Sequence, residues 1–221
     1  MISLGGSLII PDSIDADFLK GFKALILSHA AQGRKFVIIT GGGKLCRRYQ
    51  DMAKELSDVS TEDLDWIGIA SLKLNAELLR VIFGGYAHEI VINNLSDNFS
   101  FNKPIVIGAA HAPGRSTDFD AVEAAKSVGA KKVINISNID YVYDSDPKIN
   151  PNAKKLERIS WAEYRALIPA HWSSGLHTPF DPIASEMAQK EGITVMIMNG
   201  KPIDNLVKCL NGEKFLGTII K

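Results

Sequence analysis

The chain has 221 residues, of which 46% are hydrophobic and 23% are charged, a balance typical of a globular protein with a sizeable core. Its 25 Lys and Arg are matched by 25 Asp and Glu without any block of like charge, which argues against a nucleic-acid-binding or membrane-surface protein. No apolar run approaches the roughly 20 residues of a membrane span, and the N-terminus lacks a signal pattern, so we expect a cytoplasmic protein.

Short, almost continuously apolar runs predict β-strands that are buried on both faces. A very short strand is expected before Gly5, and the clearer strands are 36–40, 89–93, 104–108, 132–136 and 194–198. Strands of this kind belong to a parallel sheet that is covered by helices on both sides.

Segments of helical period lie between the strands, at 15–31, 44–56 and 65–83. Later helices begin with start signals, which are Thr117 or Asp118 as an N-cap, a Ser160–Glu163 capping box, and Asp181 before a proline. Strand and helix alternate without a linker, so we expect one α/β domain over residues 1–221, with a mainly parallel sheet between helical layers. Ligands of such sheets bind beyond the carboxyl ends of the strands.

Two glycine-rich turns follow the first two strands. "LGGSL" lets backbone N–H groups and a hydroxyl approach a phosphate, although such a sequence is usually only a turn. "TGGGKLCRR" joins a buried strand to a helix N-terminus, which is typical of an anion site. Its spacing fits neither a Walker A loop nor GxGxxG, and tight packing is the alternative interpretation.

Two further loops carry polar groups. "AAHAPGRSTDFDA" combines a Pro-Gly turn, a guanidinium and a helix start, which indicates either a second phosphate site or a simple N-cap. "SNIDYVYDSDPK" offers groups for a ribose or base, with a β-hairpin as the alternative. Together the four loops favour phosphoryl transfer, which needs positioned donors and cations more than covalent help from the protein.

In this order the loops resemble the amino acid kinase family and, within it, the archaeal-type uridylate kinases. The resemblance runs from "SLGGSLI" to "GTII" and rests on "GGGKLCRRY", "LDWIGIASLKLNAELL", "PGRSTDFDAV", "NIDYVYDSDPKINPNAKK", "FDPIAS" and "NGEKFLGTII". It implies a three-layer α/β/α sandwich whose N-terminal part mainly binds the acceptor and whose C-terminal part mainly binds ATP. It also implies transfer of the ATP γ-phosphoryl to UMP with Mg²⁺, in pyrimidine nucleotide synthesis, by a homohexamer.

The resemblance assigns site residues position by position. ATP-binding residues would be Gly6, Ser7, Gly43, Arg47, Ser137, Asn138, Tyr143 and Asp146. UMP-binding residues would be Gly42, Asp65, His111, Ala112, Pro113, Gly114, Arg115, Ser116 and Thr117. Catalytic residues would be Asp181, Lys44 and Arg115, while Mg²⁺ would be held through the nucleotide phosphates. For Asp181 an N-cap role is an equally good physical interpretation.

Three residues depart from the family pattern. Ser3 stands where bacterial-type members have a lysine, Lys73 replaces an arginine, and Tyr141 replaces a glycine in the "DGVY" motif. A lysine lacks the bidentate fork of arginine. Two alternatives therefore stay open, a kinase of the same fold that acts on another small phosphate or carboxylate, and a non-catalytic protein that binds nucleotides or oxyanions.

Overall fold

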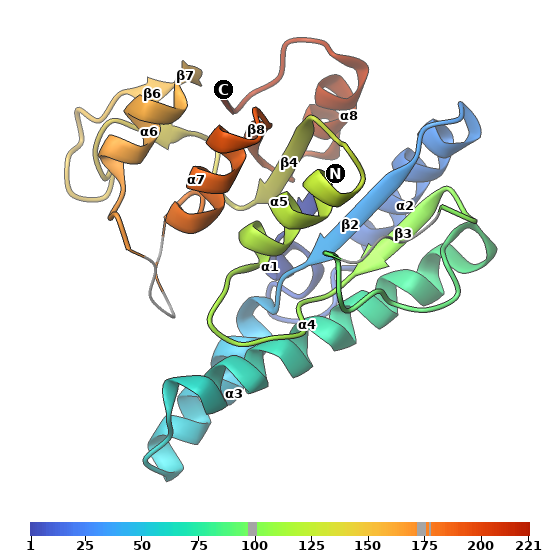
Figure 1. Ribbon diagram of the computed structural model, residues 1–221, viewed down its shortest axis with the longest axis horizontal. Helices are drawn as coiled ribbons and strands as arrows, with labels where there is room; N and C mark the ends of the chain where they lie inside the picture. Colours follow the sequence, from blue (N-terminus) through green and yellow to red (C-terminus); the bar gives the residue numbers. More distant parts are fainter. Residues whose placement is uncertain (97–100, 172–175, 177) are drawn as a thin grey trace.

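A computed structural model describes residues 1–96, 101–171, 176 and 178–221 (Figure 1). Within these residues seven strands form one sheet in the order β3-β2-β1-β4-β8-β9-β7. Their bounds are β1 (Ile2–Leu4), β2 (Phe36–Thr40), β3 (Ile105–Gly108), β4 (Lys132–Ser137), β7 (Arg158–Ile159), β8 (Thr194–Asn199) and β9 (Thr218–Ile220). Neighbouring strands are parallel except for β8 and β9, so the prediction of a mainly parallel sheet is confirmed.

Successive residues of each central strand enter two different cores. In β2, Phe36 and Ile38 belong to one core, whereas Val37 and Ile39 belong to the other. Side chains of a strand alternate between the faces of the sheet, so both faces must be apolar when both are covered. This explains why the strands are continuously apolar in the sequence.

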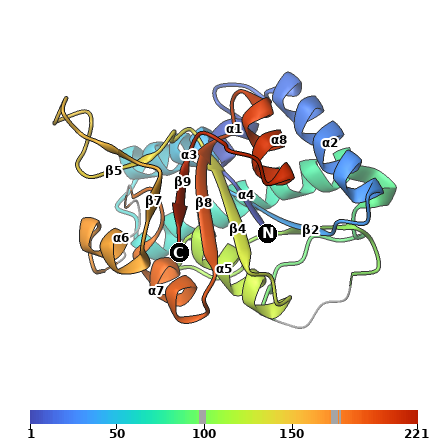
Figure 2. The same cartoon turned by 90° about the horizontal axis from the view of Figure 1, so that it is seen from above.

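Helices cover both faces (Figure 2). The first core contains residues of α2 (Ala16–Ala31), α4 (Thr61–Phe83) and α8 (Ile203–Asn211). The second core contains residues of α5 (Thr117–Ser127), α6 (Trp161–Leu167) and α7 (Pro182–Lys190). The predicted three-layer α/β/α sandwich is therefore confirmed.

The remaining elements lie around these layers. The short helix α1 (Gly6–Ile9) follows β1, and η1 (Gly84–Tyr86) follows α4. Helix α3 (Gly43–Leu56) has no buried residue and, with the first half of α4, forms an arm that extends from the body (Figure 1). Strands β5 (Val142–Tyr143) and β6 (Lys155–Leu156) form a separate antiparallel ribbon, whose second strand lies beyond the segment 137–148 for which a hairpin was the alternative. Among the described helices none has both the length and the apolar character of a membrane span.

The prediction of a strand at 89–93 was wrong. The chain pairs with β3 here through two isolated bridges, Ala87 with Ile105 just before this segment and Ile92 with Gly108 within it. Between them the Ile90 N–H donates to His88 Nδ1 at 3.4 Å, which makes a local turn and leaves Ile90 exposed. The turn interrupts the ladder, so a run with strand composition forms no strand.

Two helix starts also differ from the sequence prediction, and one further helix was not predicted. Helix α4 begins at Thr61 because Ser60 caps it, accepting from the Asp63 N–H, so Asp65 lies in its second turn. Helix α5 is capped by Ser116, not by Thr117 or Asp118. Helix α1 was not predicted. The capping box of Ser160 and Glu163 and the N-cap role of Asp181 are both confirmed.

Candidate active site

The strand order reverses between β1 and β4, since the chain builds outward to β2 and β3 on one side and to β8 on the other. Open α/β sheets bind ligands beyond the carboxyl ends of the strands at such a switch point. The turn after β1 carries Gly6 and Ser7, and the turn after β4 carries Ser137. These turns touch, because the Gly5 N–H donates to Ile136 O at 2.7 Å. These two parts of the predicted ATP site lie roughly 130 residues apart in the sequence, and the fold brings them into contact.

The two glycine loops also meet each other. A Cβ on Gly6 would lie 2.3 Å from Gly41 O and 2.4 Å from Gly43 N, and Gly43 has φ +69°. Only glycine allows this approach. The tight packing expected as an alternative for the second loop therefore occurs at Gly43, and the contact with Gly6 brings the start of α3 beside the turn after β1. A helix start with free N–H groups is suited to an anion.

Asn75 supports this loop and was not predicted as a site residue. It lies in α4, is 1% exposed, and donates from Nδ2 to Gly41 O at 2.8 Å. Nearby, Thr40 Oγ1 donates to Leu72 O at 2.9 Å. The side of α4 that faces the sheet thus fixes the loop after β2. The sequence signal that could have identified Asn75 is an amide side chain within the apolar stripe of a predicted helix.

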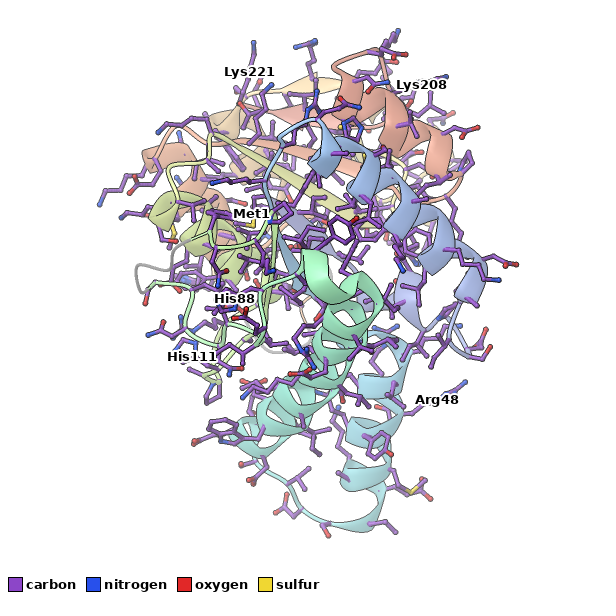
Figure 3. All side chains as sticks on the ribbon, turned by 90° about the vertical axis from the view of Figure 1, so that its right-hand side faces the viewer. Met1, Arg48, His88, His111, Lys208 and Lys221 are labelled. Atoms are coloured by element: carbon purple, nitrogen blue, oxygen red, sulfur yellow. The ribbon has the colours of Figure 1, made fainter. Side chains whose placement is uncertain are left out.

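The cations of the second glycine loop lie at its outer side. Lys44 Nζ is 3.0 Å from Asp12 Oδ1, and Arg48 Nη2 is 3.5 Å from the same oxygen. All three side chains and Arg47 are exposed, so these ion pairs contribute little to stability. In Figure 3, Arg48 lies on the α3 side of the arm and His111 on the α4 side.

The predicted acceptor loop, residues 111–117, is tied to α4. The Gly114 N–H donates to Asp65 Oδ2 at 2.9 Å, and Gly114 has φ +80°. Ser116 Oγ accepts from the Phe119 N–H at 3.2 Å as the N-cap of α5. The structure thus brings together Asp65 and the loop, which the sequence places about 50 residues apart.

Arg115 is held against its own helix. Its Nη1 lies 3.4 Å from Glu123 Oε2, and its guanidinium lies 5.3 Å from the centre of the Phe119 ring. Both charged side chains are largely buried, so this pair is screened less than a surface pair. Of the guanidinium nitrogens, only Nη1 forms a hydrogen bond among the described residues, to Glu123.

Asp118 joins β1, β4, α5 and α7, although it was not among the predicted site residues. Its Oδ1 accepts from Asn135 Nδ2 at 2.8 Å and from Ser3 Oγ at 3.4 Å, and its Oδ2 accepts from the Asp181 N–H at 3.2 Å. Burial, and next the nearby Asp181 carboxylate, raise the pKa of Asp118 to about 7. The sequence pattern indicated Asp118 only as a possible N-cap of α5.

Asp181 combines both roles considered for it. It is 4% exposed, and its Oδ1 accepts from the Ala184 N–H at 2.7 Å as the N-cap of α7. The other oxygen, Oδ2, is buried and has no hydrogen-bond partner of normal geometry among the described residues. Burial raises the pKa of Asp181, whereas hydrogen bonding to the Ala184 N–H and the Ser116 hydroxyl lowers it. One oxygen thus caps α7, and the other is a buried acceptor without a hydrogen-bond partner of normal geometry in the described part of the chain.

The predicted adenine-nucleotide loop spreads over a wider region. Ser137 Oγ accepts from the Ile139 N–H at 3.2 Å, and Asn138 is exposed. Tyr143 lies in β5, and Asp146 Oδ1 accepts from the Lys148 N–H in a turn that projects from the body (Figure 2). Tyr141, which replaces the glycine of the family pattern, is buried, with Lys155 Nζ 4.8 Å from its ring centre. The larger side chain is therefore packed within the fold.

Two cavities lie away from the switch point. One of about 330 Å³ is lined by residues that include Trp161, Gln189 and Lys221. The other, of about 480 Å³, lies at the opposite ends of the strands and is lined by residues that include Phe36 and Lys132. Neither is lined by a predicted site residue, so the candidate site rests on the loops at the carboxyl ends of the strands.

Asp120 gives a test of the electrostatics beside the site. It is 1% exposed, and its Oδ2 has no hydrogen-bond partner among the described residues. Burial raises the pKa of Asp120 to about 7; the charge of Arg115 lowers this pKa and that of Glu123 raises it further. The folded state therefore holds more protons than the unfolded state between the unfolded pKa near 3.8 and pH 7, so ionisation costs stability as the pH rises through this window.

We expect Asp120→Asn to gain stability relative to the wild type as the pH rises from 5 to 8, by about 1 kcal/mol or more, because one proton is worth about 1.4 kcal/mol per pH unit. Urea unfolding of both proteins at both pH values measures this difference. A difference in the free energy of unfolding that does not change with pH would contradict the placement of a buried carboxyl there.

Residues 1–199 match the pattern of the amino acid kinase family. The chain belongs to the amino acid kinase family. Its relatives include a uridylate kinase of Thermoplasma acidophilum, 34% identical over all of this chain and 95% of that protein. A uridylate kinase of Staphylothermus marinus is 38% identical over 84% of each chain. The resemblance read from the motifs is thereby confirmed.

Solved structures of this family have the same fold. The uridylate kinase of Archaeoglobus fulgidus is 32% identical, with a TM-score of 0.85 over 100% of this chain and 98% of that chain. The UMP kinase of Bacillus anthracis, 21% identical with a TM-score of 0.79, agrees in fold. The family's sandwich is thus retained across the full chain.

Proposed function

We propose that this amino acid kinase family member transfers the γ-phosphoryl group of ATP to UMP, forming UDP and ADP. The observation that carries the proposal is the full-length similarity to uridylate kinases, which includes every loop of the candidate site. Such a nucleoside monophosphate kinase would serve pyrimidine nucleotide supply in the cytoplasm.

The geometry supports a division of labour around the switch point. The glycine turns with Gly6, Ser7 and Gly43 would bind the ATP phosphates, with Ser137 beside them. Asp65 and the loop 111–117 would bind UMP, because the Asp65–Gly114 hydrogen bond fixes the loop on α4. The N-terminal part would thus serve mainly the acceptor and the C-terminal part mainly ATP.

Phosphoryl transfer to a phosphate oxygen asks the protein for orientation and charge rather than for a base. Asp181 would orient a cation through Oδ2, while Lys44 and Arg115 would neutralise charge on the transferred group. Ser3 is buried against Asp118 and brings no charge. We therefore assign the neutralising charge to Lys44, Arg47 or Arg115, together with Mg²⁺.

The residues at the switch point fit Mg²⁺ that arrives with ATP. The described residues hold no cluster of three or more His, Cys, Asp or Glu side chains suited to a metal. Mg²⁺ in kinases is usually bound by one or two carboxylates together with substrate phosphates, and here Asp118 and Asp181 are adjacent. When bound, Mg²⁺ would neutralise charge on the phosphates.

We further propose that the protein is a homo-oligomer, a hexamer by its family resemblance. Helix α4 exposes one stripe with four apolar members, Trp66, Ala70, Leu74 and Val81. An exposed apolar stripe on a long helix is typical of a surface that is covered in an assembly.

ADP release from the purified protein with Mg²⁺ and ATP, measured over a panel of nucleoside monophosphates and small acids, tests the function. We expect the highest kcat/KM with UMP. A higher kcat/KM for another acceptor would assign a different substrate, and nucleotide binding without turnover on any acceptor would indicate a non-catalytic protein.

A further inference from the structure

Tyr164 binds both main-chain polar groups of a single residue, Phe180. The Tyr164 hydroxyl donates to Phe180 O at 2.8 Å and accepts from the Phe180 N–H at 2.7 Å. The side chain is fully buried, and burial raises the pKa of Tyr164, so the hydroxyl keeps its proton as a donor. The backbone immediately before Asp181 is therefore clamped by one hydroxyl group.

The helix that carries this hydroxyl is itself firmly held. Helix α6 begins with a complete capping box, and Trp161 Nε1 donates to Ile193 O at 3.1 Å. The Trp161 ring packs against the rings of Tyr164 and Phe180, each at 6.2 Å between centres. The two hydrogen bonds to Phe180 thus lie beside a packed aromatic cluster in the second core.

The clamp determines where Asp181 lies. One peptide beyond Phe180, the Asp181 N–H donates to Asp118 Oδ2 and its carboxylate caps α7. Its Oδ2 stays buried without a hydrogen-bond partner among the described residues, beside an Asp118 side chain that contacts β1 and β4. A shift of the backbone at Phe180 would move this carboxylate directly, because no rotatable side chain separates the clamp from the Asp181 peptide.

We propose that Tyr164 is a positioning residue for phosphoryl transfer, which acts by fixing the backbone that carries Asp181. The inference rests on the proposed function. Tyr164 lies in the second core, and both of its hydrogen bonds go to Phe180, so its effect on the reaction passes through Asp181.

Tyr164→Phe removes only the hydroxyl and leaves both groups of Phe180 without a partner in a buried place. Because small displacements of a reacting group are costly, we expect kcat to fall about tenfold, with the KM for ATP and UMP changing less than about twofold. In the Asp181→Asn background the same change should lower kcat by less than about twofold. A full tenfold loss in that background would overturn the proposal, because Tyr164 would then act independently of Asp181.

Trp161→Phe is the matched control. It removes another buried hydrogen bond from the same helix, the one to Ile193 O. It keeps an aromatic ring beside Tyr164 and Phe180 and both hydrogen bonds to the Phe180 backbone. We expect a comparable loss of stability and an unchanged kcat. A tenfold loss of kcat in this variant as well would overturn the proposal, since any loosening of α6 would then be enough.

Amide hydrogen exchange, followed by NMR, tests the clamp without the reaction. In the wild type the Phe180 and Asp181 amides should exchange as slowly as the amides of α6, and Tyr164→Phe should speed them at least tenfold while Trp161→Phe does not. Fast exchange in the wild type would overturn the proposal without any variant. If the wild type phosphorylates no acceptor, the proposed function fails, and exchange still decides whether Tyr164 holds Asp181.

Discussion

Replacing Asp181 by Asn is expected to lower kcat for UMP phosphorylation by at least about 100-fold, the cost of losing one preorganised electrostatic group in an active site. Asn has the size of Asp and caps helices equally well, so the cap on Ala184 is retained. Only the negative charge of the carboxylate, whose Oδ2 is buried without a partner among the described residues, is removed. Steady-state kinetics and thermal unfolding together separate this loss of activity from a loss of fold.

Asp15→Asn is the control for that experiment. Asp15 caps α2 in the same way, accepting from the Phe18 N–H at 2.9 Å, and is not part of the candidate site. We expect this variant to keep its kcat within about twofold. An Asp181→Asn enzyme with more than a third of the wild-type kcat would contradict a role for this carboxylate in the reaction.

Gly6→Ala is expected to have the largest effect on the fold. Its methyl group would lie 2.3 Å from Gly41 O, and the atoms that it meets are backbone rather than a flexible side chain. Overpacking of this kind typically costs about 1–3 kcal/mol, and the two glycine loops would have to separate. We expect reduced stability in urea unfolding and a KM for ATP raised at least about tenfold.

Gly21→Ala is the matched control for Gly6→Ala. Gly21 lies in the middle of α2, where a Cβ would meet only the Ile203 side chain at 3.8 Å and 3.9 Å. Ala is preferred to Gly in helices, so we expect a gain of about 0.5–1 kcal/mol and unchanged kinetics. A Gly6→Ala protein as stable as the wild type, with the same KM for ATP, would refute the close contact between the loops.

The sequence was sufficient for the architecture because its signals are local and agree with one another. Runs such as Phe36–Thr40 are apolar at every position, and the helices between them have clear starts at Ser160 and Asp181. The segment 89–93 has the same composition but lies outside β3 in the sheet, with a turn at His88 and Ile90. Composition does not reveal whether a local turn interrupts a strand.

The candidate site was predictable only where a motif is continuous in the chain. Gly6, Gly43 and the loop 111–117 stand out because glycine, proline and helix starts are visible in a short window. Three other residues have hydrogen-bond partners that lie 16 to 34 residues away in the sequence, namely Asn75, Asp118 and Tyr164. Such contacts exist only after folding, so the sequence shows these residues merely as polar members of helices.

The fate of the γ-phosphoryl group tests the central proposal most directly. The purified protein is incubated with Mg²⁺, UMP and ATP labelled with ³²P in the γ position, and the products are separated by chromatography. We expect the label in UDP, with one ADP formed for each labelled UDP and no transfer when UMP is omitted. Label that remains in ATP, or that appears only as inorganic phosphate, would contradict the assignment of this protein as a kinase of UMP.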